Sequence, residues 1–358
     1  RRLFMKVLQL NSTEKRIVAN NHSLSSYLKM LSIGRQATPH SWLYENESSN
    51  ETLARWIPIM EKANLKSPYG EEFNQFDRLQ LAKFGPQGKV PPMFTAETNE
   101  VLEPMYTPSA YDNELALSKY FSYADEFARE LFGNRLRTKR PLSYQTVVDD
   151  MRARDTLVTN SGWPRFRKRD IVQDQEVRDA EDGKAYDYPA ILLFRQYNGK
   201  LRPVWMYPMS MNLMELRYSQ VIQDSIQNSP NIWVRNYVTP WAGFEDVKRN
   251  LTKQWWCLSG RSVVSGDTTK MDAHMRKAQI RLVYEIVKHL FQESYWSELY
   301  SVMMQVCDID LIVGSTKKIV GSHGLASGSG WTQEVETVLQ MFMAWLKLLK
   351  GMGIGDDF

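Results

Sequence analysis

Two aspartates near the end of the chain and one far upstream are residue types that can bind a metal ion. Asp356 and Asp357 follow Gly355 on a turn, where adjacent side chains point to opposite sides. Gly and Asp are ordinary turn residues, so this motif alone also fits a plain surface turn. Asp267 follows an expected strand at residues 258–264 and precedes a turn into a helix. Carboxylates and freed backbone carbonyls are hard oxygen ligands, which favours Mg²⁺.

Cations are expected on one face of a β-hairpin. The segments 191–195 and 200–208 read as two strands around a turn. Lys200 and Arg202 project from the same face because side chains alternate along a strand, and Arg195 lies on the partner strand. A guanidinium offers a fork of donors to phosphate oxygens, so this face suits a triphosphate. Charges that protect an edge hairpin from aggregation are the alternative.

A turn followed by a basic cluster lies between residues 159 and 170. The turn and the cluster, with their interleaved aromatic residues, include Ser161, Gly162, Trp163, Pro164, Arg165, Arg167, Lys168 and Arg169. Cations beside aromatic rings suit the phosphate backbone and stacked bases of a nucleic acid. Taken alone, a solvated basic loop explains the same pattern.

A Gly/Ser-rich loop at residues 321–330 runs into a helix that opens at Trp331. The loop contains Ser327 and Gly328, and Thr332 follows in the first turn of the helix. A flexible backbone before a helix N-terminus lets N–H groups approach a ligand closely. Many Gly/Ser loops are only linkers, so this loop gains meaning from the motifs around it.

The composition indicates a large folded protein. The 358 residues, 43% of them hydrophobic, suffice for one large core or for two or three merged subdomains. The net charge of +4 permits a polyanionic partner where basic residues cluster. Cys257 and Cys307 are the two cysteines, which excludes a disulfide framework and a cysteine-based zinc site. The apolar run at 341–349 is too short to span a bilayer and carries Lys347, so we expect a soluble protein.

Two long stretches around these motifs are expected to be helical. Apolar residues at helical spacing predict a helix over residues 113–133, capped by Asn113 and stopped by Gly133. Residues 273–306 are expected to be largely helical. The buried stripe of this second stretch is predicted to be Ile280, Val283, Ile286, Val287, Leu290 and Phe291.

Taken together and in order, these motifs resemble those of a viral RNA-dependent RNA polymerase. Asp267 and Asp272, five residues apart, match the first palm motif of that family, although an acid at a helix start is also favoured by the helix dipole. The second and third palm motifs are matched by Ser327-Gly328-x-x-x-Thr332 and Gly355-Asp356-Asp357.

Upstream segments extend the resemblance. The family's basic fingers hairpin is matched by Lys200-x-Arg202-x-Val204-Trp205, and its template-side loop by Ser161-Gly162-Trp163-Pro164. The amino-acid sequence at residues 202–208 and 325–330 most resembles that of polymerases from double-stranded RNA viruses of the picobirnavirus and partitivirus type.

This resemblance implies an α+β, right-hand polymerase fold, in which helices flank an antiparallel sheet. The fingers and part of the palm would be present and the thumb missing. The implied parts are N-terminal extension and fingers (1–150), fingers with the template loop and the basic hairpin (151–250), palm (251–275), a fingers insertion (276–315) and palm cut after Gly-Asp-Asp (316–358). Both ends of the chain look cut, so the fragment by itself is expected to be inactive.

The activity that the resemblance implies is template-directed transfer of ribonucleotides to an RNA 3′-hydroxyl, for viral genome replication and transcription. Asp267 and Asp356 would hold two Mg²⁺ (or Mn²⁺) ions, supported by Asp357 and by a carbonyl near Thr268. Template and product RNA and nucleoside triphosphates would be the partners, with viral capsid protein as a further one. The protein would act in the host cytoplasm or inside the virion.

The other motif residues would bind the nucleotide and the template. Arg195, Lys200 and Arg202 would neutralise the triphosphate. The rest of the nucleotide site would be Asp272, Ser327, Gly328, Thr332 and Glu336. Glu336 departs from the family, in which most members carry an amide or a short acid at this position. The turn and basic cluster at 161–169 would line the template path.

Other functions fit parts of the same pattern. A reverse transcriptase, or another two-metal nucleic-acid enzyme, would prefer deoxynucleotides; Asp272 stands where reverse transcriptases carry an aromatic gate, and an acid there favours ribonucleotides. A non-catalytic RNA-binding fragment would bind RNA in a salt-dependent way without extending a primer. A phosphate-binding enzyme built on the Gly/Ser loop would be expected to carry a Walker pattern, which the sequence lacks.

Overall fold

The computed structural model describes residues 4–37, 49–81, 87–197, 199–255, 265–347 and 351–354. The strand expected at residues 258–264 and the Gly-Asp-Asp turn lie outside these residues. Among the helices that are described, none is both long enough and apolar enough to cross a membrane.

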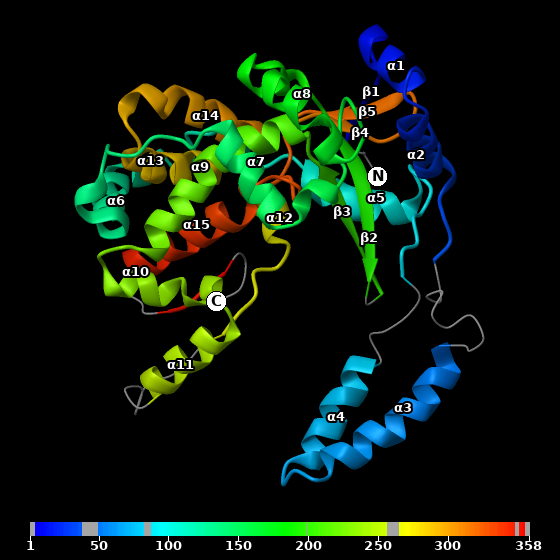
Figure 1. The fold of residues 1–358 in the computed structure, drawn as a ribbon, viewed down its shortest axis with the longest axis vertical. Helices are drawn as coiled ribbons and strands as arrows, with labels where there is room; N and C mark the ends of the chain where they lie inside the picture. The colour runs from blue at the N-terminus through cyan, green and yellow to red at the C-terminus, as the bar shows by residue number, and fades with distance from the viewer. Residues whose placement is uncertain are drawn as a thin grey trace.

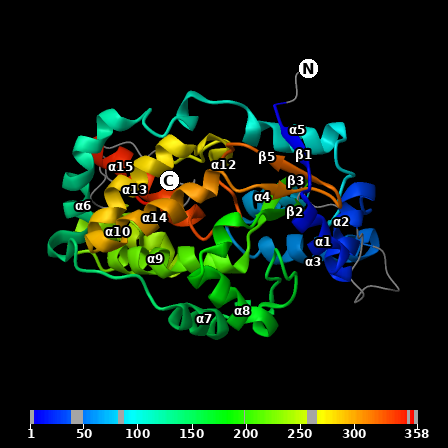
Figure 2. The same cartoon turned by 90° about the horizontal axis from the view of Figure 1, so that it is seen from above.

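A five-stranded sheet forms one side of the molecule, and its strands come from distant parts of the chain (Figures 1 and 2). In the order β1-β5-β4-β2-β3, the strands are Lys6–Gln9, Lys317–Val320, Leu311–Ile312, Ala190–Tyr197 and Lys200–Met206. All neighbours pair antiparallel except β2 and β4. This parallel pair departs from the all-antiparallel sheet that was expected. A parallel pair needs a long crossover, and the helices between β3 and β4 supply it.

The expected hairpin is confirmed as β2 and β3. The two strands pair along their length, with Arg195 opposite Arg202 and Tyr197 opposite Lys200. Gly199 supplies the left-handed turn conformation, with a φ of +68°. Residues directly opposite each other in an antiparallel pair point to the same face of the sheet. Arg195, Lys200 and Arg202 therefore share one face of this hairpin.

Most helices after residue 123 form the other side of the molecule, while the blue and cyan helices of the first 106 residues lie around the sheet (Figure 2). The described α-helices are Ser12–Ala19 (α1), His22–Ile33 (α2), Ser49–Asn64 (α3), Gly70–Leu81 (α4), Ala96–Tyr106 (α5), Ala124–Phe132 (α6), Tyr144–Ala153 (α7), Arg169–Glu181 (α8), Met209–Gln227 (α9), Ile232–Tyr237 (α10), Phe244–Trp255 (α11), Met271–His274 (α12), Lys277–Val287 (α13), Trp296–Met304 (α14) and Thr332–Leu346 (α15). Short 3₁₀ turns occupy Ala110–Asp112, Ser118–Tyr123, Gly133–Arg135, Thr156–Val158, Lys184–Asp187, Thr239–Ala242, Lys288–Leu290, Glu293–Tyr295 and Gln305–Cys307.

Helix α9 lies at the centre of this helical side. It packs against α6, α7, α8, α10, α14 and α15. Most of its residues are buried, including the polar ones Ser210, Asn212, Glu215, Ser219 and Ser225. A helix that is enclosed on all sides is part of a core, and polar groups inside it need hydrogen-bond partners. The partners of Asn212 and Glu215 lie in the loops that form the candidate site.

The helix predicted over residues 113–133 is wrong in its first half. Only α6 is α-helical, and it follows the 3₁₀ turn Ser118–Tyr123. Asn113 accepts a hydrogen bond from the N–H of Leu115 (3.1 Å), so its side chain closes a local turn instead of capping a helix. Leu115 is 52% exposed, so burial does not hold this segment in a helix. The stop at Gly133 is confirmed, with a φ of +56°.

The largely helical stretch at 273–306 is confirmed, although short 3₁₀ turns divide it into α13 and α14. Every member of its predicted stripe is buried: Ile280, Val283, Ile286, Val287, Leu290 and Phe291. Helix α15 also begins where the sequence predicts, directly after Trp331.

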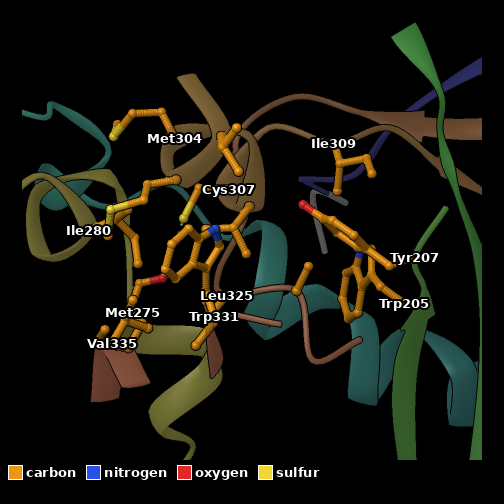
Figure 3. Packing of buried hydrophobic residues seen from close by; sticks show 14 of the residues in the cluster. Trp205, Tyr207, Met275, Ile280, Met304, Cys307, Ile309, Leu325, Trp331 and Val335 are labelled. Atoms are coloured by element: carbon orange, nitrogen blue, oxygen red, sulfur yellow. Dashed lines mark hydrogen bonds between the residues drawn. The ribbon is translucent and has the colours of Figure 1, made fainter. Parts of the chain in front are cut away.

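The core runs continuously from the sheet into the helices (Figure 3). Trp205 at the end of β3 is 1% exposed and stacks on His323, with ring centroids 5.5 Å apart. The two ring nitrogens of His323 lie 2.7 Å from the carbonyl oxygen of Gly324 and 2.9 Å from that of Ile309. This buried histidine thereby holds the start of the Gly/Ser loop against the core.

Helices α3 and α4 form a hairpin that extends away from the rest of the molecule in Figure 1. Asn64 at the end of α3 donates hydrogen bonds to Asn74 (2.8 Å) and Asp77 (2.7 Å) of α4. Several large apolar side chains on these two helices are exposed, among them Trp56 and Phe76. The hairpin is thus held by its own contacts and carries an uncovered apolar surface.

We expect Phe342→Ala to lower the free energy of unfolding by about 3–5 kcal/mol, because it opens a cavity in the core. Phe342 is 1% exposed, and the centroid of its ring lies 5.3 Å from that of Phe127. The adjacent Met343 is 50% exposed, so Met343→Ala should change stability by less than about 0.5 kcal/mol. Denaturant unfolding of the two variants measures the difference, and equal effects would contradict the packing described here.

Candidate functional site

The loop at residues 160–168 is built by backbone contacts that require glycine. Asn160 and Lys168 form a β-bridge, and the side chain of Asn160 accepts a hydrogen bond from the N–H of Gly162 (2.8 Å). Gly162 has a φ of +70°, and a Cβ there would lie 2.8 Å from the carbonyl oxygen of Tyr207. The peptide bond between Trp163 and Pro164 is cis. The loop therefore sits directly on the junction between β3 and α9.

The cations of this loop divide into inward and outward groups. Arg165 forms ion pairs with Glu176 (2.8 Å) and Asp179 (2.7 Å) of α8. Arg169 is half-buried and donates a hydrogen bond to the side-chain oxygen of Asn212 (3.1 Å). The exposed cations of the predicted cluster are Arg167 and Lys168.

The aromatic and turn residues of this loop also face inward. Trp163 is 2% exposed, so its ring belongs to the core. Pro164 is half-buried, and Phe166 packs on Tyr27 with ring centroids 5.4 Å apart. Ser161 is buried, and its carbonyl accepts the N–H of Met209 at the start of α9 (2.8 Å). Base stacking on Trp163, which the sequence suggested, would need this core contact to open.

The Gly/Ser loop packs against both Asp272 and the hairpin. The N–H of Leu325 donates to the carbonyl of Asp272 (2.8 Å), and a Cβ on Gly324 would lie 2.3 Å from the same oxygen. Ser327 donates its hydroxyl to the carbonyl of Pro203 in β3 (3.4 Å). The loop thus brings the start of α12 and the cationic hairpin to one place.

Gly328 makes the tightest of these contacts. A Cβ built on this residue would lie 1.5 Å from the carbonyl oxygen of Trp205, which is too close for any side chain. The carbonyl of Gly328 itself accepts a hydrogen bond from the side-chain amide of Asn212 (3.3 Å). The glycine of the predicted motif is therefore required by close backbone packing.

Glu215 of α9 lies beneath this loop and was not found from the sequence. Its carboxylate is fully buried and accepts hydrogen bonds from the N–H of Gly330 (3.0 Å), the amide of Asn212 (3.0 Å) and the hydroxyl of Ser329. Burial raises the pKa of Glu215 to about 7, and these hydrogen bonds oppose the shift. The signal that the sequence offers is a single glutamate within the short apolar run from Leu213 to Leu216.

The first turns of α15 continue the site. Thr332 is half-buried and its hydroxyl donates to the carbonyl of Ser329 (3.5 Å). Glu336, which departs from the family pattern, is buried at 6% exposure. Glu334 is also buried, and burial raises its pKa to about 7. The side-chain amide of Gln340 is buried without a hydrogen-bond partner among the described residues.

The described part of the candidate metal site consists of Asp267 and Thr268. Asp267 is exposed, and its carboxylate has no ion-pair or hydrogen-bond partner among the described residues. Thr268 beside it is half-buried. Asp356 and Asp357 lie outside the described residues, within which no group of three or more His, Cys, Asp or Glu side chains is placed to hold a metal ion.

The architecture and the meeting of these loops define a protein of mixed helix and sheet with the fold of viral RNA-dependent RNA polymerases. The solved RNA-dependent RNA polymerase of a human picobirnavirus matches with a TM-score of 0.70, covering 98% of this chain and 69% of that chain. An insertion loop deletion mutant of such an enzyme matches with a TM-score of 0.74, covering 98% and 71%. Both are 22% identical in sequence to this chain.

The sequence comparison points to the same relatives. The chain is 25% identical over 341 residues to a curated protein of Human picobirnavirus named "Potential RNA-dependent RNA polymerase". The match covers 89% of this chain and 60% of the relative, so the chain spans about 60% of the relative's length. No protein-family model matches. The resemblance to the picobirnavirus type that the motifs indicate is confirmed in sequence and in fold.

Replacing Gly328 with alanine should cost at least about 2 kcal/mol of stability, because neither the loop nor β3 can give way freely. Gly330→Ala is the matched control in the same loop. Its Cβ would meet the flexible side chain of Leu216 at 3.3 Å, so we expect a cost of at most about 1 kcal/mol. Denaturant unfolding compares the variants, and similar losses would argue against the close approach of Gly328 to Trp205.

The stability of the protein should also depend on pH through Glu215 and Glu334. Folding raises the pKa of each carboxyl from 4.5 to about 7, so the folded state holds these protons more tightly. The stability that this contributes is fully present below pH 4.5 and is lost as the pH rises through 7.

Glu215→Gln removes one such group, so its stability relative to wild type should increase between pH 5 and pH 8, by up to about 3 kcal/mol. Denaturant unfolding at several pH values measures this. Glu97→Gln is the control for loss of charge at an exposed position. A constant difference between Glu215→Gln and wild type at all pH values would contradict the assignment.

Proposed function

We propose that this chain is part of an RNA-directed RNA polymerase that transfers ribonucleotides to an RNA 3′-hydroxyl on an RNA template. The observation that carries the proposal is the junction of Asp272, the loop around Gly328 and the cationic hairpin in a fold shared with viral RNA-dependent RNA polymerases. Sequence similarity over most of the chain to a potential polymerase of the same type supports it.

The parts of the chain take the roles of the polymerase fold in this proposal. The palm comprises residues 251–275 and 316–358, with a fingers insertion at 276–315. Residues 151–250 are fingers, and residues 1–150 are N-terminal extension and fingers. A mixed sheet that is surrounded by helices supports a right-hand arrangement of this kind. No segment of this chain is assigned to the thumb in this proposal.

Two divalent ions, Mg²⁺ or Mn²⁺, are proposed as cofactors. The exposed carboxylate of Asp267, which forms no ion pair or hydrogen bond with the described residues, fits a hard-cation ligand. Asp356 and Asp357, with a carbonyl near Thr268, would complete the ligand set. When bound, such ions lower the pKa of the attacking hydroxyl and stabilise the leaving oxygens.

The cationic hairpin face is proposed to bind the triphosphate. Arg195 and Arg202 lie directly opposite each other, and like charges in that position destabilise a hairpin. A polyanion across Arg195, Lys200 and Arg202 would relieve this repulsion and receive bidentate hydrogen bonds. Fixed cations aimed at phosphate oxygens supply electrostatic stabilisation of the charge that develops during transfer.

The sugar is proposed to be read where Asp272 meets the Gly/Ser loop. Asp272, Ser327 and Thr332 would contact the ribose, because the 2′-hydroxyl distinguishes RNA precursors from DNA precursors. Glu336 would approach the same site from α15. The contact between Leu325 and the backbone of Asp272 supports a shared site for the two motifs.

Template RNA is proposed to run along the loop at 160–168. Arg167 and Lys168 would contact phosphates, since these cations are exposed. Arg165 and Arg169 would hold the loop in shape through their internal contacts. Viral capsid protein is a further proposed partner, with action inside the virion or in the host cytoplasm, on the ground that the relatives are viral.

The decisive experiment is template-directed extension of an RNA primer with ribonucleotides and Mg²⁺ by the polymerase of which this chain is proposed to be a part. Asp267→Asn should reduce incorporation by at least about 10³-fold, because a metal ligand supplies several kcal/mol of transition-state stabilisation. RNA binding should stay unchanged. The matched control is Asp308→Asn, at an exposed aspartate that pairs with Lys277 (2.8 Å).

The same assay separates the alternatives. Preference for deoxynucleotides would indicate a reverse transcriptase, and salt-dependent RNA binding without extension would indicate a non-catalytic RNA-binding protein. Calorimetric titration with Mg²⁺ gives an independent readout. Binding that is equally strong in Asp267→Asn would overturn the proposed role of this residue.

A further inference from the structure

A chain of hydrogen bonds crosses the N-terminal half of α9 and joins two loops that are far apart in sequence. At one end, Arg169, which begins α8 directly after the loop at 160–168, donates to the side-chain oxygen of Asn212 (3.1 Å). The amide of Asn212 donates in turn to Glu215 (3.0 Å). At the other end, Glu215 accepts the N–H of Gly330 (3.0 Å) and the hydroxyl of Ser329 in the Gly/Ser loop.

The directions of these bonds leave little freedom. Asn212 uses its oxygen for Arg169 and its amide for both Glu215 and the carbonyl of Gly328 (3.3 Å). Ser329 gives its proton to Glu215 and accepts the N–H of Trp331 (3.0 Å). Each member therefore fixes the orientation of the next, and the loss of one leaves a buried group unpaired.

Packing alone does not require a carboxylate at this position. Glu215 is fully buried, and an isolated buried charge is costly unless several hydrogen bonds satisfy it. A leucine of similar volume would fill the same space without that cost. The two carboxylate oxygens of Glu215 accept hydrogen bonds from Ser329 and Gly330, in the loop that carries the second palm motif.

The first loop is also anchored to α9 by its backbone. The carbonyl of Ser161 accepts the N–H of Met209, the first residue of the helix (2.8 Å). Ser210 donates its N–H to Glu176 (3.1 Å), which also holds Arg165 of the loop. A displacement of the loop is therefore passed to the first turn of α9, where Asn212 lies.

We propose that Asn212 and Glu215 are positioning residues that couple the template-side loop to the nucleotide-side loop of this polymerase. Template RNA bound to Arg167 and Lys168 orders the loop at 160–168. Through Arg169, Asn212 and Glu215, this order is passed to residues 328–331. The inference rests on the proposed function for the ligands that it names, and the hydrogen-bonded coupling can be tested without them.

Coupling of this kind is reciprocal. If bound RNA raises the affinity for a nucleoside triphosphate by some factor, the triphosphate must raise the affinity for RNA by the same factor. An enzyme built in this way binds nucleotides more tightly when a template strand is present, which limits untemplated addition.

Hydrogen–deuterium exchange of the 358-residue chain tests the bonds themselves. In Glu215→Gln, which keeps the shape of the side chain, the amides of Gly330 and Trp331 should exchange at least about tenfold faster than in wild type. Arg169→Gln should also accelerate exchange at 328–331, although this residue lies at the start of α8, far away in the sequence. Arg167→Gln, at an exposed position in the loop at 160–168, is the matched control and should leave 328–331 unchanged.

A second control is Glu298, a glutamate that contacts α9 at another place. Glu298 accepts the hydroxyl of Tyr218 from α9 (2.6 Å) and pairs with Arg217 (3.1 Å), away from the Gly/Ser loop. Glu298→Gln should lower stability without a selective change at 328–331. If Glu215→Gln folds and its exchange at 328–331 equals that of wild type, the coupling is refuted. Ser329→Ala provides the same test from the other end if Glu215→Gln does not fold.

The functional part uses a short RNA oligonucleotide and GTP with Mg²⁺ as probes. In wild type, saturating RNA should raise the affinity for GTP by about fivefold or more, and Asn212→Ala should bring that factor close to one. Glu298→Gln should retain it. The same factor in Asn212→Ala and wild type would overturn the coupling.

A pattern of results separates this inference from the proposed function. If wild type binds neither RNA nor GTP, the proposed polymerase function fails, and the exchange data still decide whether the two loops are linked through Asn212 and Glu215. If both ligands bind, the ratio of ribonucleotide to deoxynucleotide incorporation should fall in Glu215→Gln and not in Glu298→Gln. A purely structural role of Glu215 would leave that ratio unchanged.

Discussion

The backbone of Gly328 lies against the carbonyl of Trp205 with no room for a side chain, and the candidate site depends on this contact. It joins the Gly/Ser loop to the end of β3, while Leu325 joins the same loop to Asp272. Because both contacts are made by backbone atoms, their geometry is set by the fold and not by rotamers. The cationic hairpin, the start of α12 and the first turn of α15 are therefore held in fixed register before any ligand arrives.

A polar layer inside the helical body supports that register. Helix α9 is buried like a core helix, yet its Asn212 and Glu215 form hydrogen bonds with Arg169 and with the Gly/Ser loop of the candidate site. Burying such groups costs stability unless every hydrogen bond is made, so the layer tolerates few arrangements. The fold thus exchanges some stability for a unique placement of its loops, as active sites commonly do.

The sequence predicted best those features that local pattern decides. The β2–β3 hairpin follows from alternation around a turn at Gly199, and the buried stripe of α13 follows from helical spacing. The helix predicted over residues 113–133 is wrong in its first half because the side chain of Asn113 closes a local turn. Apolar spacing does not reveal such a turn. Glu215 is not predicted from the sequence because its two partners in the Gly/Ser loop, Ser329 and Gly330, lie more than a hundred residues away, and a single sequence carries no trace of that contact. The inward role of Arg165 likewise depends on Glu176 and Asp179, which only the folded chain brings to it.

The arginines that face each other across the hairpin have a thermodynamic meaning as well. Arg195 and Arg202 are held opposite each other in the folded chain, while an unfolded chain lets them separate. An anion that bridges them binds the native state and not the denatured one, and mass action then shifts the folding equilibrium with ligand concentration. The persistence of the folded molecule would in this way depend on the local concentration of polyanions.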